Sequence, residues 1–252
     1  MLPYINIHTH RPTGRGIELR TAGIHPWEAD SQDVEAFAAR FADKGGSAGT
    51  GVAGGTTAGT GHVGEGVVRD ETAGTEHVGE GVVRDETAGT ERVGNEAAEV
   101  QAIGETGLDF ACPVPREAQF AALRAQLDLA RRTGRPVVLH CVRAFEPLMR
   151  ELAACEPRAV IFHGFIGSPE QAQQALRRGY YLAFGERTFA SSKTLRALCE
   201  TPLGQLFFET DAAGVTIEEI YARAAEALGR PVEELQRATL ENYKRLFETQ
   251  NG

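Results

Sequence analysis

The sequence predicts an α/β fold built on a parallel sheet, and three observations lead to that class. Its 252 residues suffice for one large domain of the α/β barrel kind. Short apolar runs alternate with helical patterns along most of the chain. Polar residues that can perform chemistry follow most of these runs. This alternation is typical of parallel strands covered on both faces, in a sheet that is either open or closed into a barrel.

Seven short apolar runs are the predicted strands. Each is nearly continuous, as expected for a strand buried on both faces. A barrel of eight strands would need one more, which is either irregular or hidden by an insertion. The predicted strands cover residues 4–7, 22–24, 100–103, 137–139, 160–162, 180–184 and 206–208.

Helical patterns lie between the strands, and the clearest covers residues 117–133. Its apolar residues recur at spacings of three and four and form one stripe. Gly134 and Pro136 follow as a stop signal. Capping boxes beginning at Ser168 and Thr216 predict the first turns of two further helices.

An insertion interrupts this pattern at residues 45–95. Residues 62–76 and 77–91 are identical copies of one 15-residue unit, and the insertion holds more than half of the chain's 29 glycines. Such a segment has too little apolar area to offset the entropy of ordering it, so we expect a disordered loop within a single domain spanning 1–252. His62 and His77 are expected to be solvated rather than metal ligands.

The composition and charge of the chain argue against several classes of protein. No apolar run approaches the roughly 18 residues of a membrane span, and the N-terminus lacks a secretory pattern, so we expect a cytoplasmic protein without a membrane partner. The four scattered cysteines predict neither a disulfide framework nor a zinc ribbon. A net charge of −9 argues against a broad basic face for nucleic acid, so a phosphate substrate would need local attraction. No obligate protein partner is evident, and the sequence leaves the oligomeric state open.

Imidazoles and carboxylates follow five of the apolar runs. In a parallel barrel the carboxyl ends of all strands open onto one face, so these groups would meet there. Four imidazoles and two carboxylates are too many for one tetrahedral site but suit two divalent ions that share a bridging carboxylate. Mg, Mn and Zn are the candidate metals. The predicted ligands are His8, His10, Glu105, His140, His163 and Asp211.

Several motifs together resemble one family. They are HTH at residues 8–10, GIHPW at 23–27, AIGETGLD at 102–109, VVLHC at 137–141, IFHGF at 161–165, GYYLAFG at 179–185 and FFETDA at 207–212. In this order they are similar to the TatD-related metal-dependent hydrolases of the amidohydrolase superfamily. The resemblance implies a distorted TIM barrel, two divalent metal ions and deoxyribonuclease activity. It also implies one ion on His8, His10, Glu105 and Asp211, and another on Glu105, His140 and His163, so that Glu105 is the bridge.

Some positions depart from the commonest family pattern. Asn6, Arg11 and Ala213 stand where Asp, Leu and Pro are usual, and His140 is followed by Cys-Val-Arg. None of these changes removes a ligand, so they bear on the substrate more than on the hydrolytic chemistry. The function that the resemblance implies is thus a deoxyribonuclease with 3'-5' exonuclease-like action on single-stranded ends. The alternatives are an amide or ester hydrolase, such as an aminoacyl-ester deacylase, and a non-catalytic metal-binding protein.

The predicted catalytic residues are Asp211 and Glu105. Asp211 would accept the proton of an activated water, and Glu105 would bridge the two ions. Arg143 would either contact a phosphate oxygen or stand as a solvated arginine at the start of a helix. His25 would either cap a loop or face the substrate, and the family likeness favours the substrate pocket. Trp27 and Phe165 follow strand ends, where ordinary packing is the favoured use and stacking on an unpaired base is the alternative.

Overall fold

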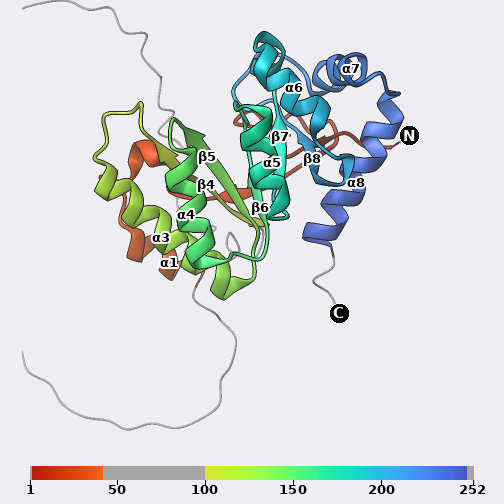
Figure 1. The fold of residues 1–252 in the computed structure, drawn as a ribbon. Coiled ribbons are helices and arrows are strands. Elements are labelled where there is room, and N and C mark those ends of the chain that lie inside the picture. The colour runs from red at the N-terminus through yellow and green to blue at the C-terminus, as the bar shows by residue number, and fades with distance from the viewer. Residues whose placement is uncertain (1, 42–99, 249–252) are drawn as a thin grey trace, which may run out of the picture. The chain divides into compact units, whose positions relative to one another are not determined.

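In the computed structural model of the chain, the described residues are 2–41 and 100–248. All of them belong to one compact unit, whose course is drawn in Figure 1. The insertion predicted at 45–95 lies outside the described residues.

The centre of the described fold is a set of parallel strands. Six form one sheet in the order β3-β4-β5-β6-β7-β8, and β1 pairs with β2. Each neighbouring pair is parallel, which confirms the predicted fold class. The strands are β1 (Ile5–Asn6), β2 (Ile17–Glu18), β3 (Thr21–Ala22), β4 (Ala102–Asp109), β5 (Val137–Val142), β6 (Val160–Phe162), β7 (Tyr181–Phe184) and β8 (Leu206–Phe208).

Backbone hydrogen bonds close these strands into a ring. The Ile7 amide donates to the Phe208 carbonyl at 3.0 Å, and residue Asp211 forms a parallel bridge with Thr9, so β8 lies beside β1. The strands β2 and β3 are two halves of one extended stretch, which bonds to β1 at its start and to β4 at its end. Among the described residues the ring therefore has seven positions, which matches the number of predicted strands.

The first crossover of the ring contains no helix. Between β1 and β2 the chain returns through residues 7–16, and at its end a side chain on Gly16 would place its Cβ 2.5 Å from the Tyr4 carbonyl oxygen. Glycine at this position therefore lets the returning chain lie against β1. The next described crossovers, from β4 onward to β8, each contain an α-helix. The barrel is thus distorted at its first crossover.

Helices cover the outside of the ring from β4 onward. The predicted helix at 117–133 is confirmed as α3, and both predicted capping boxes are present, at Ser168 and Thr216. None of the described helices has the combined length and apolar character needed to cross a bilayer. The helices are α1 (Val34–Ala39), α3 (Arg116–Thr133), α4 (Phe145–Cys155), α5 (Pro169–Arg177), α6 (Ser192–Glu200), α7 (Ile217–Leu228) and α8 (Val232–Phe247), with short 3-10 turns η1 (Pro26–Glu28), η2 (Glu186–Ala190) and η3 (Leu203–Gln205).

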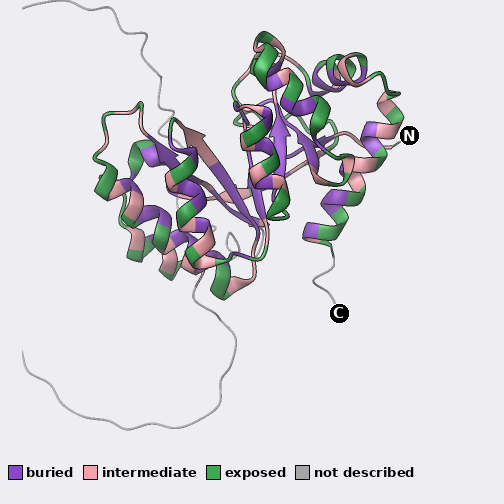
Figure 2. Ribbon diagram, viewed as in Figure 1, coloured by how far each residue is buried: buried purple, intermediate pink, exposed green. Residues whose placement is uncertain are grey.

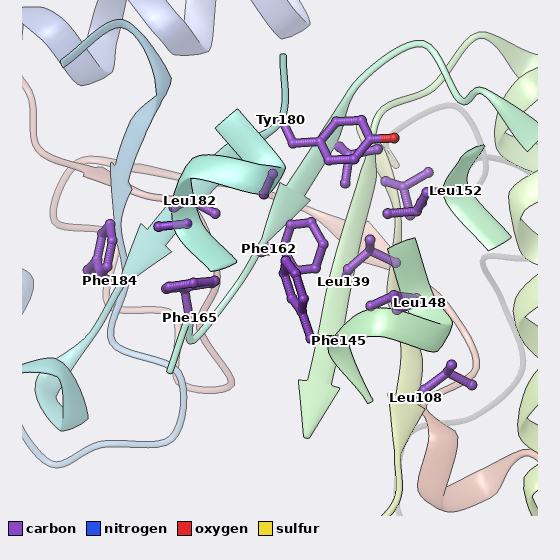
Figure 3. Packing of buried hydrophobic residues seen from close by; sticks show 14 of the residues in the cluster. Leu108, Leu139, Phe145, Leu148, Leu152, Phe162, Phe165, Tyr180, Leu182 and Phe184 are labelled. Carbon is purple, nitrogen blue, oxygen red and sulfur yellow. The ribbon is translucent and has the colours of Figure 1, made fainter. Parts of the chain in front are cut away.

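Alternate residues of the strands pack into two separate apolar cores. On β5 and β6, Leu139 and Phe162 face the helices, as Figure 3 shows, whereas Val138 and Ile161 belong to the inner cluster. Most strand residues are accordingly buried in Figure 2, whereas β2, β3 and the carboxyl end of β5 have intermediate exposure. Tyr243 of α8 joins the inner cluster. Arg245 of the same helix donates to the hydroxyl of Tyr181, the first residue of β7, so α8 covers the amino ends of the strands. A functional site can therefore form at the carboxyl ends.

A β-bulge in β4 decides which way Glu105 points. The predicted strand at 100–103 ended before Glu105, which was wrong, because β4 continues to Asp109. Ile103 pairs with Val137 and Thr106 pairs with Leu139, so two residues of β4 oppose the single residue Val138. The extra residue shifts the alternation of inward and outward side chains by one position. Glu105 therefore points inward, although Ile103, two residues earlier, faces the outer core. Its neighbour Gly104 fits only without a side chain, since a Cβ there would lie 2.5 Å from the Val138 carbonyl oxygen.

The bulge predicts that Gly104→Ala is strongly destabilising. The added methyl group would collide with the backbone of β5, and the φ of +153° is one that residues with a side chain rarely adopt. We expect the free energy of unfolding, measured with urea, to fall by about 2 to 5 kcal/mol. Gly204→Ala is the matched control, because a Cβ there meets nothing within 4 Å, and its effect should stay within about 0.5 kcal/mol. Equal stability of the two variants would contradict this account of the bulge.

Candidate metal centre

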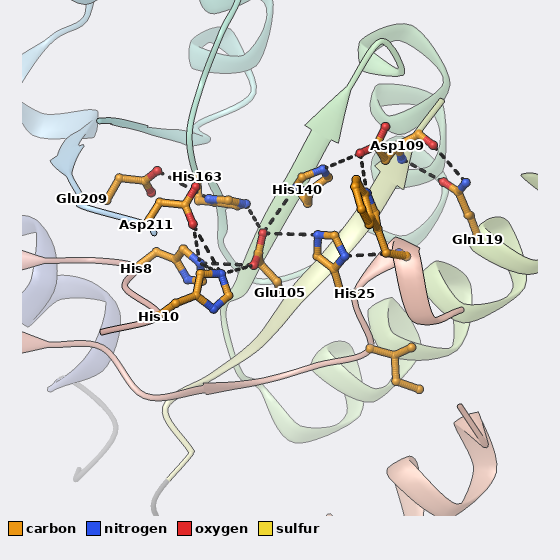
Figure 4. Close-up of polar contacts among 12 residues, drawn as sticks. His8, His10, His25, Glu105, Asp109, Gln119, His140, His163, Glu209 and Asp211 are labelled. Carbon is orange, nitrogen blue, oxygen red and sulfur yellow. Dashed lines mark hydrogen bonds and ion pairs between the residues drawn. The ribbon is translucent and has the colours of Figure 1, made fainter. Parts of the chain in front are cut away.

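The six predicted ligands come together at the carboxyl ends of the strands, around Glu105 (Figure 4). One carboxylate oxygen, Oε2, lies 3.2 Å from His8 Nε2 and 3.3 Å from His10 Nε2. Asp211 completes this first set, with its Oδ1 3.4 Å from His10 Nε2 and 3.8 Å from His8 Nε2. The spacing of two residues between the histidines does place both imidazoles on the same side of the chain.

The other oxygen of Glu105, Oε1, faces a second set of imidazoles. His140 Nδ1 lies 3.2 Å away, and His163 Nε2 is in closer contact. His25 Nε2 is 3.7 Å away. His8, His10 and Asp211 thus lie around one oxygen of the carboxylate, and His140, His163 and His25 around the other.

Closure of the ring brings the first set together from opposite ends of the chain. The Asp211 amide donates to the His8 carbonyl, and the His10 amide donates to the Asp211 carbonyl, each at 3.1 Å. Asn6 stands behind this junction, where its Nδ2 donates to the Thr210 hydroxyl at 2.9 Å and its Oδ1 accepts the Thr210 amide at 3.1 Å. A carboxylate at this buried position could not donate, so the departure from the family pattern at Asn6 replaces a charge by a neutral pair of hydrogen bonds.

Glu105 is held as an anion. Burial alone would raise the pKa of its carboxyl, but the hydrogen bond from His140 and the close imidazoles of His163 and His8 hold that pKa far below its ordinary value. Its side chain is only 8% exposed, so water contributes little to stabilising the charge. The imidazoles around it must supply that stabilisation, either as protonated rings or as ligands of a cation.

The surroundings of His163 fit a cation. Both of its ring nitrogens are buried, and within the part of the chain that the structure describes neither has a hydrogen bond of good geometry. They lie against two carboxylates, Glu105 on one side and Glu209, 3.5 Å from Nδ1, on the other. Burial would lower the pKa of His163, but these two carboxylates raise it to about 10. A positive charge is therefore favoured here, and with nitrogen and carboxylate donors on several sides a divalent metal suits the position.

Two carboxylates that sequence reasoning did not select support the centre. Asp109 Oδ2 lies 3.2 Å from His140 Nε2 and accepts the Trp27 indole N–H at 2.7 Å. It fixes the ring of His140 so that Nδ1 faces Glu105. Glu209 is 1% exposed and contacts His163 in a similar way. Their positions in the sequence could have indicated both carboxylates, because Asp109 ends the GETGLD motif and Glu209 begins the ETD motif.

The residues predicted to bind substrate fall into different places. His25 belongs to the cluster, and its Nδ1 accepts the Trp27 backbone amide at 3.2 Å. Arg143 is exposed and lines a pocket of about 450 Å³ together with His140, His163 and Asp211. Phe165 is only 5% exposed and packs against Phe184 in the outer core, in agreement with the ordinary packing that was favoured for it.

Comparison with known proteins identifies the relatives of this chain. The family described as "TatD related DNase" matches residues 19–248. The protein named "Uncharacterized metal-dependent hydrolase YjjV" from Escherichia coli (strain K12) is 34% identical over 167 residues, which make up 60% of this chain and 64% of that protein. The protein named "3'-5' ssDNA/RNA exonuclease TatD" from Enterobacter lignolyticus (strain SCF1) is 38% identical over 128 residues, 46% of this chain and 47% of that protein. The chain spans about two thirds of the length of the first of these relatives and about half of the second.

Solved structures agree with the observed fold. The crystal structure of the E. coli YjjV protein, a TatD homologue, aligns with a TM-score of 0.56 at 31% identity, covering 61% of this chain and 66% of that chain. A TatD family hydrolase from Entamoeba histolytica aligns with a TM-score of 0.54 at 18% identity, a likeness that supports the fold alone. The predicted barrel class is thereby confirmed.

The contact between Asp109 and His140 predicts the effect of Asp109→Asn. The amide keeps the size of the side chain but loses the charge that orients His140, so the affinity of the protein for Zn²⁺ should fall about 10- to 100-fold. Competition with a chromogenic chelator measures this affinity. Asp128→Asn is the control, because Asp128 pairs with Arg131 and Arg132 on the exposed face of α3. Unchanged affinity in Asp109→Asn would show that the contact does not position His140.

Proposed function

The chain belongs to the TatD-related DNase family, and on that basis we propose that it is a divalent-metal-dependent hydrolase of phosphodiester bonds. The observation that carries the proposal is the buried Glu105 carboxylate, whose two oxygens face two different sets of imidazoles. The favoured substrate is the end of a single DNA strand, cleaved in the manner of a 3'-5' exonuclease. A relative named "3'-5' ssDNA/RNA exonuclease TatD" supports this choice of substrate.

The proposed centre holds two divalent ions, with Mg, Mn and Zn as candidates. His8, His10, Glu105 and Asp211 would hold one, and Glu105, His140 and His163 the other. When bound, such ions make a water more acidic and offset the negative charge that develops on the scissile group. Glu105 would serve as the shared ligand because each of its oxygens faces one set of nitrogens.

Asp211 is suited to accept the proton of the attacking water. Its side chain is 41% exposed, whereas those of Glu105 and Glu209 are 8% and 1% exposed. A carboxylate that accepts a proton during each turnover must return it to solvent, which requires this access. Glu105 is held too strongly as an anion for that role, because the surrounding imidazoles keep its pKa far below its ordinary value.

His25 and Arg143 would orient the substrate. Because His25 Nδ1 accepts the Trp27 amide, the proton of the neutral ring lies on Nε2, which faces Glu105. Burial and the nearby His140 lower the pKa of His25 to about 4, so it would act near neutral pH as an uncharged donor to a substrate oxygen. Arg143, at the rim of the 450 Å³ pocket, would provide the local positive charge that the acidic chain otherwise lacks.

Glu105→Gln tests the proposal. The wild-type protein should carry two metal ions per chain by elemental analysis and release nucleotides from a labelled single-stranded oligonucleotide. The variant should carry at most one ion, and its rate of release should fall by at least about 100-fold. Glu151→Gln is the matched control, since Glu151 pairs with Arg124 on α3, away from the centre, and should leave both values unchanged.

The same assays separate the alternatives. Unchanged metal stoichiometry in Glu105→Gln would contradict the bridge. Hydrolysis of aminoacyl esters without hydrolysis of phosphodiesters would favour a deacylase. A protein that binds two ions and hydrolyses neither would favour the metal-binding role.

A further inference from the structure

We propose that Trp27 is a preformed stacking surface for an unpaired nucleobase beside the metal centre. This inference rests on the proposed function and names the part of the substrate that the site recognises. It follows from the exposure of the indole, from the way its orientation is fixed, and from its place in the pocket.

Trp27 is unusually exposed for its type. Among the described residues, the large apolar side chains with the greatest exposure are Trp27, at 59%, and Ile166, at 44%. Scattered apolar residues on a surface need no explanation. These two, however, both line pockets of the candidate site.

Hydrogen bonds to neighbouring groups fix the orientation of the exposed indole. Its Nε1 donates to Asp109 Oδ2 at 2.7 Å, and the carboxylate of Asp109 is only 4% exposed. Its backbone amide is bound by His25, and the short turn η1 begins at Pro26, directly before it. The indole N–H thus has its hydrogen-bond acceptor inside the protein, while much of the side chain remains exposed to solvent. A ring held in this way loses little conformational entropy when a ligand stacks on it.

Trp27 and Ile166 flank Glu105 from different pockets. Trp27 lines a pocket of about 690 Å³ that also contains His10 and Glu105, whereas Ile166 lines the 450 Å³ pocket that contains His163 and Asp211. Each of the two pockets at the candidate metal centre therefore has one exposed apolar side chain.

This arrangement matches the chemistry of a nucleic acid strand. A phosphodiester carries a nucleoside on each side of the scissile group, whereas a small ester or amide need not carry a flat apolar group on either side. A base can offer its face to Trp27 only when it is not stacked in a duplex. The geometry therefore points to a base of an unpaired strand on Trp27, with the adjacent phosphodiester at Glu105.

A comparison of strands with and without bases tests the proposal. Wild-type, Trp27→Ala and Trp27→Phe proteins, all loaded with Mn²⁺, would act on a single-stranded oligonucleotide and on a strand of equal length whose sugars carry no bases. We expect Trp27→Ala to raise KM for the normal strand about 5- to 100-fold more than for the abasic strand, because the loss of the indole contact with Asp109 affects both strands alike. Trp27→Phe, which keeps a ring, should lie between wild type and Trp27→Ala for the normal strand.

Fluorescence gives a second readout, because Trp27 is the chain's single tryptophan. A phosphorothioate oligonucleotide with bases should quench its emission in the metal-loaded wild-type protein, whereas the abasic strand should not.

The outcomes are distinguishable. An equal loss of activity on both strands in Trp27→Ala would show that Trp27 acts only through Asp109 and His140, and would overturn the proposal. Equal quenching by both strands, or none by either, would overturn it as well. If the wild-type protein cleaves neither strand, the proposed function fails, while quenching by the base-containing strand alone would still support the stacking surface.

Discussion

The carboxylate of Glu105 is the constraint on which the rest of the site depends. A buried anion is stable only where cations or hydrogen-bond donors replace the water it has lost. Here the donors are imidazoles carried by four segments of the ring, at β1, β3, β5 and β6, and they meet at the two oxygens of one side chain. Glu105 thereby organises the histidines, and the raised pKa of His163 is one consequence.

The backbone makes this convergence possible. The bulge at Gly104 turns Glu105 into the ring, and the junction of Thr9 with Asp211 closes the ring where the first set of ligands gathers. The other end of the ring is covered by α8, so polar chemistry is confined to the carboxyl ends of the strands. The helix-free crossover after β1 shows that this centre does not require a complete ring of helix crossovers.

The sequence predicted the parts of the fold that depend on local pattern. The apolar stripe of α3 and the capping boxes at Ser168 and Thr216 are local signals, and the structure contains all three elements. The six candidate ligands were predicted because each follows or ends an apolar run, and the structure brings all six together. Their roles as ligands remain a proposal.

Features set by contacts between distant residues were not predicted. The bulge depends on how β4 meets β5, so a linear pattern ended the strand too early. β2 has two residues, which is too short for any periodicity. Asp109 and Glu209 matter only because His140 and His163 lie beside them.

Anomalous X-ray diffraction from crystals grown with Mn²⁺ tests the central claim most directly. The account predicts two anomalous peaks, one on each side of the Glu105 carboxylate, the first bounded by His8, His10 and Asp211 and the second by His140 and His163. A single peak, or peaks away from Glu105, would contradict it.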